Sequence, residues 1–492
     1  MKRIDIVKLF LLATVLISTG CKKGFLDKTP LASISVDSYY KTEDDAIKAV
    51  TAVYSILQTD MAFDGQFVNL LEVTTDDATG GGVGGEGNGT GSYLFQSTDN
   101  PFAASWGALY AGISRANLVT DKVPLIQMNV AKRDRLVGEA KFLRALYYFH
   151  LVNLYGEVPL FTNELAVKEA NFPKSPVADV YAQIVKDLTE ASAVLPLKSE
   201  YSSADAGRAT KGAAGALLAK AYLFQQKWAE ASAAALVVIN SGEYTLRTNY
   251  RENFSNRFNN NSESIFEIQN SDIVQTGWND EAVASIVPLW ARPGNVTNSA
   301  GEGRGGWGGL TPSTDLENEF EATDLRKKET ITQVANQVVE DGWVIGDKGS
   351  GYKLWATEGG WTEATEKDPY HQRLYRYSDL LLVCAEALAE QGNIANAAGG
   401  AAFYLNQVRS RAGLPNTTAA TQAAMIAAVR HERRVELANE YHRLYDLRRW
   451  GIVGAKLIAA GKPFEPGKHE LFPIPQTQID LSKGILKQNL NY

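Results

Sequence analysis

Three glutamates spaced by four residues, Glu432, Glu436 and Glu440, form the most densely charged stretch of the chain together with neighbouring arginines. Residues spaced by four lie on adjacent turns of one helix face. A pair of carboxylates could supply the acid and the base of a glycosidase, but such pairs project from separate elements across a cleft. On adjacent turns, glutamates instead favour ion pairs with arginines. We therefore expect them to stabilise the fold and not to catalyse.

No other catalytic pattern forms around the remaining polar residues. His431-Glu432 lacks a second histidine four residues further on, which excludes the common zinc-protease motif. No serine stands in the Gly-x-Ser-x-Gly motif of serine hydrolases. The sequence therefore predicts a protein that is not an enzyme and has no cofactor, and it leaves a calcium requirement open. The five histidines show no ligand spacing: they are His150, His371, His431, His442 and His469.

A glycine run over residues 80–91 follows the acidic pair Asp76-Asp77. The run has neither the lysine of a phosphate-binding loop nor a strand before it that leads into a helix. So much glycine favours neither a helix nor a regular strand. The two aspartates are candidates for binding a cation or for accepting hydrogen bonds from sugar hydroxyls. A solvated loop is the alternative interpretation.

Residues 243–365 form a zone rich in glycine and tryptophan. Long loops of this kind in a large folded protein usually serve a function. The C–H faces of sugar rings pack on flat aromatic rings, whereas sugar hydroxyls need amide, carboxylate or guanidinium partners. Both kinds of side chain occur here, since Asn279, Asp280, Arg292, Asn295 and Arg304 lie between the aromatic residues. Six of the nine tryptophans belong to the zone: Trp278, Trp290, Trp307, Trp343, Trp355 and Trp361.

We therefore expect a glycan platform on these loops, with a second rim from residues near the glycine run. The alternative is that the tryptophans anchor their loops to the scaffold, and we expect this alternative to hold for part of the set. The predicted glycan-binding residues are Trp278, Trp290, Trp307, Arg292, Tyr93, Phe95, Asp76 and Asp77.

The first residues have the form of an export signal. Basic residues precede an apolar run over residues 9–17, small residues follow, and then comes Cys21. This order is typical of a cleaved signal peptide, here residues 1–20. A cysteine directly after small residues resembles a bacterial lipobox, so we expect Cys21 to be lipidated; an ordinary secretory signal is the alternative. The only other cysteine is Cys384, so no disulfide is then expected.

Composition limits the remaining classes of function. Apolar residues make up 45% and charged residues 21% of the 492 residues, which is ordinary for a folded protein and excludes disorder. The net charge of -7 argues against nucleic acid or an anionic membrane surface as a partner. After the signal peptide, no stretch of about 18 residues is apolar enough to span a bilayer.

Apolar residues at spacings of three and four predict paired helices along the chain. Gly156, Gly242 and Gly392 mark helix ends. Paired helices with alanine at their contacts resemble tetratricopeptide repeats, which stack because one pair cannot bury its own apolar face. We predict a mostly α-helical protein with a repeat scaffold and long aromatic- and glycine-rich loops. The predicted helices cover residues 136–154, 214–222, 228–239, 381–388, 402–408 and 425–449.

Sequence blocks in order along nearly the whole chain resemble one family. They are Cys21 with Phe25-Leu26-Asp27 and Pro30, then residues 138–149, 155–160, 207–214, 373–380, 405–414, 432–437 and 446–451, and lastly Pro473-Ile474-Pro475 and Gln488-Asn489. Together they resemble the SusD/RagB family of nutrient-binding outer-membrane lipoproteins of Bacteroidetes.

The resemblance implies a glycan-binding lipoprotein that delivers oligosaccharide to a TonB-dependent outer-membrane transporter of the SusC type. It implies a location at the outer membrane, facing the cell surface and attached through the lipid on Cys21. After the signal peptide we expect an N-terminal region, residues 21–240, with the tether and helical repeats. A C-terminal region, residues 241–492, carries the glycan-facing loops and further repeats, and the two regions form one intertwined globule.

Two other functions fit the same features. A secreted helical glycoside hydrolase would also be rich in aromatic residues, and it would release reducing ends from glycans. A repeat adaptor that binds only protein would ignore sugar.

Overall fold

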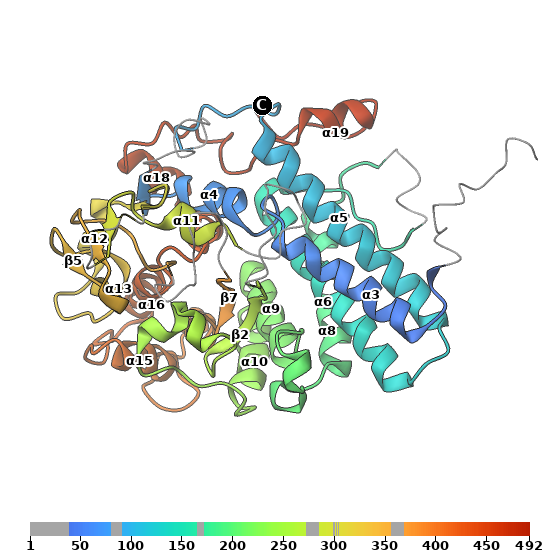
Figure 1. Ribbon diagram of the computed structural model, residues 1–492, viewed down its shortest axis with the longest axis horizontal. Helices are drawn as coiled ribbons and strands as arrows, with labels where there is room; N and C mark the ends of the chain where they lie inside the picture. The colour runs from blue at the N-terminus through green and yellow to red at the C-terminus, as the bar shows by residue number, and fades with distance from the viewer. Residues whose placement is uncertain are drawn as a thin grey trace, which may run out of the picture.

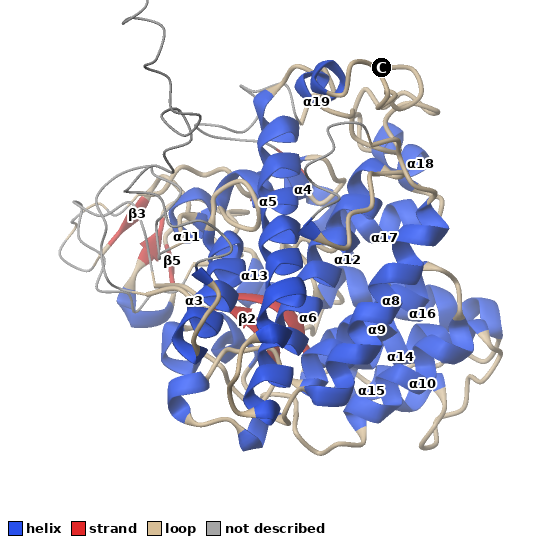
Figure 2. Cartoon of the chain, turned by 90° about the vertical axis from the view of Figure 1, so that its right-hand side faces the viewer, coloured by secondary structure: helices blue, strands red, loops and turns tan. Residues whose placement is uncertain are grey.

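A stack of long helices forms the scaffold of the protein (Figure 1). Figure 2 shows the short strands β3 and β5 at one side of the molecule, away from helices α10, α14 and α15. Within the residues described below, no helix is long and apolar enough to cross a membrane. The computed structural model describes residues 39–79, 91–164, 172–271, 285–298, 301, 303, 305–355 and 369–492.

The N-terminal half of the scaffold is a run of helices in which each helix packs on the next. The helices approach closely at small residues, because a Cβ added at Gly112 of α5 would collide with the ring of Tyr147 of α6. The run consists of α3 (Glu43–Tyr54), α5 (Asn100–Lys122), α6 (Val130–Tyr155), α8 (Val177–Val194), α9 (Lys211–Phe224) and α10 (Trp228–Ile239).

Helix α6 shows how local sequence sets a helix and its bounds. The Asn129 side chain accepts a hydrogen bond from the backbone N–H of Lys132 and so caps the N-terminus. Gly156 follows the last turn with φ of 76°, a conformation that glycine adopts without strain. The apolar positions of the predicted helix over residues 136–154 are buried. That prediction is confirmed, as are those of the helices now labelled α9 and α10.

The scaffold continues across a long gap in the sequence. Helix α10 packs on α14 (Tyr377–Glu390), which packs on α15 (Ala401–Arg411) and on α16 (Gln422–Glu436). The predicted helices over 381–388 and 402–408 are confirmed by α14 and α15. The residues between α10 and α14 are therefore an insertion in the helix stack.

The predicted single helix over residues 425–449 is wrong, because the chain forms two helices there. Helix α16 ends at Glu436, and α17 begins at Arg443 and ends at Arg449. Between them, Asn439 and Tyr441 adopt φ of 64° and 66°, which no α-helix contains. Apolar spacing alone did not reveal this turn.

Two antiparallel strands join the beginning and the end of the insertion. Strand β2 (Ser264–Ile268) pairs with β7 (Gln372–Arg376), with Glu267 opposite Arg373. All residues of both strands are buried. This pair fixes the inserted loops onto the scaffold.

Most of the remaining elements are short and belong to the insertion or its neighbours. Strand β1 pairs with β4, and β6 lies between β3 and β5. The short strands are β1 (Ala78–Thr79), β3 (Val296–Thr297), β4 (Thr311–Pro312), β5 (Gln337–Val338) and β6 (Val344–Ile345). The helices are α4 (Gly65–Val73), α11 (Val287–Ala291), α12 (Thr314–Glu319), α13 (Lys327–Thr330), α18 (Val453–Ala459) and α19 (Gln476–Leu481). Turns of 3-10 helix cover Ser55–Gln58, Val123–Leu125, Lys198–Glu200, Ser203–Asp205, Tyr250–Phe254, Asn256–Phe258 and Glu340–Gly342.

One large apolar core runs through the scaffold helices and reaches Trp290 and Leu310 of the insertion. A small satellite core of Val296, Ile345 and Trp355 lies under the strands β3 and β6. The predicted fold class, a mostly helical repeat scaffold with long loops, is confirmed.

Candidate functional site

Part of the predicted site lies outside the described residues. This holds for Cys21, for Trp278 and Trp361, and for residues 80–90 of the glycine run. The insertion still presents four described tryptophans, two of which are buried and two of which are half-buried.

Trp307 is a half-buried tryptophan on a loop that hydrogen bonds to α11. Its backbone N–H donates to the carbonyl of Leu289 at 2.9 Å, and the N–H of Gly309 donates to that of Trp290 at 2.9 Å. The Trp307 ring packs partly on the main core. The Trp307 side chain is therefore held in place without being fully buried.

Trp290 has a different role from the one predicted. Its ring is 3% exposed, and Gly309 lies so close that any side chain there would overlap the indole. Among the described residues, the indole nitrogen of Trp290 has no hydrogen-bond acceptor. The placement of Trp290 on the platform is wrong, because this ring anchors the loop that carries Trp307.

Arg292 is also buried, at 1% exposure, so its guanidinium is not available to sugar hydroxyls. It lies over the ring of Trp355, 5.7 Å from the centroid. Trp355 in turn contacts the half-buried Trp343 edge-to-face, at 6.1 Å between centroids. Trp343 was not among the preferred candidates. Trp343 follows a turn at Asp341-Gly342, where both residues have positive φ. An Asp-Gly pair is typical of turns, so this pair is the sequence signal that could have indicated Trp343.

Asp76 and Asp77 are buried in ion pairs and do not face solvent. Arg443 binds the Asp76 carboxylate through two hydrogen bonds of 2.8 and 2.6 Å, and Arg434 binds Asp77 at 2.8 Å. Burial raises the pKa of Asp76, but the hydrogen bonds and charge of Arg443 outweigh it and hold the pKa below its usual value. The prediction of a cation or sugar contact is wrong for both, because arginines already bind the carboxylates.

These aspartates instead fix the segment that precedes the glycine run. The side chain of Ser313 donates to the Asp76 carbonyl at 2.6 Å, and its backbone N–H donates to the Asp77 carbonyl at 2.8 Å. Arg434 also reaches Asp315 and Glu319 of α12. The segment before the glycine run, helix α12 and helix α16 are thereby held together.

Tyr93 and Phe95 belong to an aromatic core cluster. Their exposures are 4% and 3%, and the Tyr93 hydroxyl donates to the Thr74 carbonyl at 2.6 Å. Both rings lie about 5 Å from the ring of His469, which belongs to the C-terminal part of the chain. The prediction of these two rings on a binding rim is wrong, because they join distant segments.

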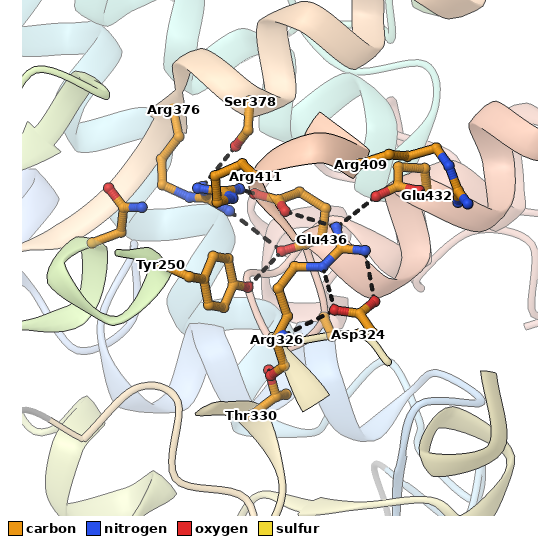
Figure 3. A network of polar contacts seen from close by, with 12 residues as sticks. Tyr250, Asp324, Arg326, Thr330, Arg376, Ser378, Arg409, Arg411, Glu432 and Glu436 are labelled. Atoms are coloured by element: carbon orange, nitrogen blue, oxygen red, sulfur yellow. Dashed lines mark hydrogen bonds and ion pairs between the residues drawn. The ribbon is translucent and has the colours of Figure 1, made fainter. Parts of the chain in front are cut away.

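The glutamates on α16 form a buried charge network, shown in Figure 3. Glu436 contacts Arg326 at 2.9 Å, Arg376 at 3.0 Å and Arg411 at 2.5 Å. Burial would raise the pKa of Glu436, but these three cations hold it well below its usual value. The expected ion pairs are therefore present, because Glu436 lies against three guanidinium groups.

The network connects the insertion to the scaffold. Arg326 precedes α13 and also contacts Glu432 at 2.6 Å, while Arg376 ends β7 and binds Glu440 at 2.7 Å. The Lys353 ammonium reaches Glu440 at 2.6 Å. The network thus attaches the insertion, whose loops carry Trp307 and Trp343, to the scaffold. In the part of the chain that the structure describes, no group of three acidic, histidine or cysteine side chains could hold a metal ion.

Known proteins share the sequence features and the architecture of this chain. Residues 351–492 match the family model described as the SusD family, and residues 84–223 match a model described as starch-binding associating with outer membrane. A solved laminarin binding SusD-like protein is 30% identical, with a TM-score of 0.79 over 92% of this chain and 100% of that one. The chain belongs to the SusD/RagB family.

Other relatives of this SusD-family protein match all or most of its length. SusD-like protein P2 of Formosa agariphila is 26% identical, and the match covers 100% of both chains. A SusD-like protein of Bacteroides ovatus is 28% identical over 90% of this chain and 82% of its own. The surface glycan-binding protein A of Bacteroides thetaiotaomicron, solved in complex with laminarihexaose, has the same fold, with 24% identity and a TM-score of 0.77 over 92% of this chain and 100% of that one.

Proposed function

We propose that this SusD-family protein binds oligosaccharide at the outer face of the outer membrane and delivers it to a TonB-dependent transporter of the SusC type. Membership of the family supports a glycan ligand, and so does the 30% identical relative that binds laminarin. The description of the family model over residues 84–223 supports association with the outer membrane.

The observation that carries the proposal is the half-buried Trp307 on a loop that is hydrogen bonded to α11. Backbone hydrogen bonds to α11 fix the loop, and the buried Trp290 anchors it from below. A rigid ring loses little conformational entropy when it binds, so the contact area of the ring contributes to affinity. Trp343 and Trp278 are the other proposed platform residues, and with Trp307 they would bind sugar through ring faces.

Attachment to the membrane is assigned to a lipid on Cys21. A single lipidated residue would carry the attachment, and the helical body would remain outside the bilayer. Replacement of Cys21 by alanine should then move the protein from the membrane fraction to the soluble fraction without changing its thermal unfolding.

Titration of the full-length Cys21→Ala protein with a panel of polysaccharides, including laminarin, tests the function. We expect at least one glycan to bind with a measurable heat and no new reducing ends to appear. Failure of every glycan to bind would contradict the proposal and favour a protein-binding adaptor. Release of reducing ends would favour a hydrolase.

A further inference from the structure

A half-open cavity of about 370 Å³ lies between α5, the segment that follows α6, and α19. Figure 1 shows α5 and α19 on the right of the molecule, whereas α11 and β5 of the insertion lie on the left. The cavity is therefore separate from the loops that carry Trp307. Its volume falls in the range of small-molecule sites, roughly 300–1,000 Å³.

Aromatic rings form one continuous wall of the cavity. The ring centroids of Tyr110 and Phe161 are 5.6 Å apart, and those of Phe161 and Phe172 are 4.3 Å apart. All three rings are half-buried. The Tyr110 hydroxyl donates to the Pro159 carbonyl at 2.7 Å, and the Phe161 N–H donates to the Tyr148 hydroxyl at 2.7 Å. These bonds fix the Tyr110 ring and the Phe161 backbone at the wall of the cavity.

Gly107 leaves the α5 side of the cavity open. It lies inside helix α5, where glycine is less favourable than alanine. A Cβ at Gly107 would meet no atom within 4 Å, whereas one at Gly112 of the same helix would collide with Tyr147. Close helix packing therefore explains Gly112 but not Gly107. At Gly107, the missing side chain adds depth to the cavity.

The polar groups of the cavity are few and neutral. Gln478 and Ser114 line it, and neither the Gln478 amide nor the Ser114 hydroxyl has a hydrogen-bond partner within the described part of the chain. None of the lining residues is charged. A phosphate or carboxylate ligand would meet no cation among the described lining residues, and a plain acyl chain would leave the amide unused. Ring faces together with an amide and a hydroxyl suit a neutral sugar ring.

We propose that this cavity is a second glycan site that accepts one neutral glycosyl unit. The unit would stack on Tyr110 and Phe161 and exchange hydrogen bonds with Gln478 and Ser114. Leu481 and Leu486 of the C-terminal segment also line the cavity, and its volume of about 370 Å³ suits a single glycosyl unit. The inference rests on the proposed glycan-binding function. Two sites on one protein raise the effective concentration of a long glycan.

Blocking the cavity tests the assignment. Gly107→Trp fills the cavity from a helix position with open space, and Gln478→Leu removes the amide without adding bulk. The matched control is Ala423→Trp, which adds the same ring at an exposed position in the first turn of α16. The probes are the methyl glycosides of glucose, galactose and mannose, measured by saturation-transfer NMR on the full-length Cys21→Ala protein.

We expect at least one methyl glycoside to bind the parent and Ala423→Trp alike. Gly107→Trp should weaken that binding by about tenfold or more, and Gln478→Leu by about fivefold, since a stacked ring and a hydrogen bond are lost. Trp307→Ala alters the proposed platform and not the cavity, so it should not remove the part of the binding that Gly107→Trp removes. Equal binding by the parent and both cavity variants would overturn the second site, as would selective binding of 4-nitrophenol in place of the glycosides.

The two proposals fail in different ways. If polysaccharide binds the parent but Trp307→Ala abolishes all glycoside binding, the cavity is not a glycan site and the proposed function stands. If no polysaccharide binds but a methyl glycoside binds and is lost in Gly107→Trp, the cavity stands and the proposed delivery of polysaccharide fails.

Discussion

Trp290 and Trp307 lie on adjoining backbone segments, yet their rings have different surroundings. The Trp290 ring is enclosed by the main core and by Gly309, whereas the Trp307 ring is only half-buried. A half-buried ring still has exposed surface, whereas an enclosed ring contributes only to packing. The same substitution at the two positions should therefore act on different properties.

Truncation of Trp307 to alanine should weaken glycan binding with little effect on unfolding. If a sugar covers about half of the ring, roughly 25 cal/mol per Å² of lost apolar contact gives on the order of 1–2 kcal/mol, or about 5- to 30-fold in affinity. Trp290→Ala should instead lower the free energy of unfolding by about 3–5 kcal/mol, because it leaves a cavity. Calorimetry beside thermal melting separates the two effects. Unchanged affinity in Trp307→Ala would show that this ring is not in the platform.

At the scale of elements, strand pair β2–β7 and helix α16 hold the insertion on the helix stack. The strands bring Arg376 beside Glu436 and Glu440, which come from α16 and the turn after it. A buried ion pair gains little over apolar packing, but removal of one partner leaves an uncompensated charge. We therefore expect the insertion and the scaffold to unfold together.

Glu436→Gln should lower the free energy of unfolding by about 3–5 kcal/mol, since it leaves three buried arginines with less negative charge. The matched control is Glu43→Gln, which removes an ion pair with Lys132 that is 41% exposed at the glutamate. That change should cost less than about 1 kcal/mol. Denaturant unfolding measures both. Equal stability of the parent and Glu436→Gln would contradict the bracing role, and we expect glycan affinity below the melting range to stay close to that of the parent.

Across the whole molecule, the pKa values of buried carboxyl groups shift in opposite directions. Burial opposes the charges of Glu267 and Asp446, but Arg373 and Arg433 respectively outweigh it and lower both pKa values to about 2. As pH falls below the ordinary carboxyl pKa, these two groups stay ionised in the folded protein, whereas the same groups bind protons in the unfolded chain. Their stabilisation is complete above the ordinary pKa and is lost as pH falls towards 2.

Glu72 behaves in the opposite way, because burial raises its pKa to about 8. The folded protein then binds more protons than the unfolded chain between about pH 4.5 and 8, so this group lowers stability as pH rises through that range. Glu72→Gln should raise the melting temperature at pH 8 and leave it nearly unchanged at pH 4. Differential scanning calorimetry at the two pH values checks this. An equal change at both pH values would mean that the fold does not raise the pKa of Glu72.

Local patterns determined the helices of the scaffold. The spacing of apolar residues predicted α6, α9, α10, α14 and α15, because one turn of helix repeats every 3.6 residues and leaves its mark in the sequence. The same spacing missed the turn at Asn439 and Tyr441, where two residues at positive φ divide α16 from α17. Sequence blocks along the chain were sufficient to indicate the family, which the comparisons confirm.

Only the tertiary structure decided which site residues face solvent. Arg434 reaches Asp77 across 357 positions of the chain, and Tyr93 packs on His469. No local pattern encodes such contacts, because the exposure of a side chain is set by every segment that folds over it. Residue type alone therefore predicted only the kinds of side chain that a sugar platform would need. The packing of distant segments determined that Trp307 is only half-buried while Trp290, Arg292 and the two aspartates are buried.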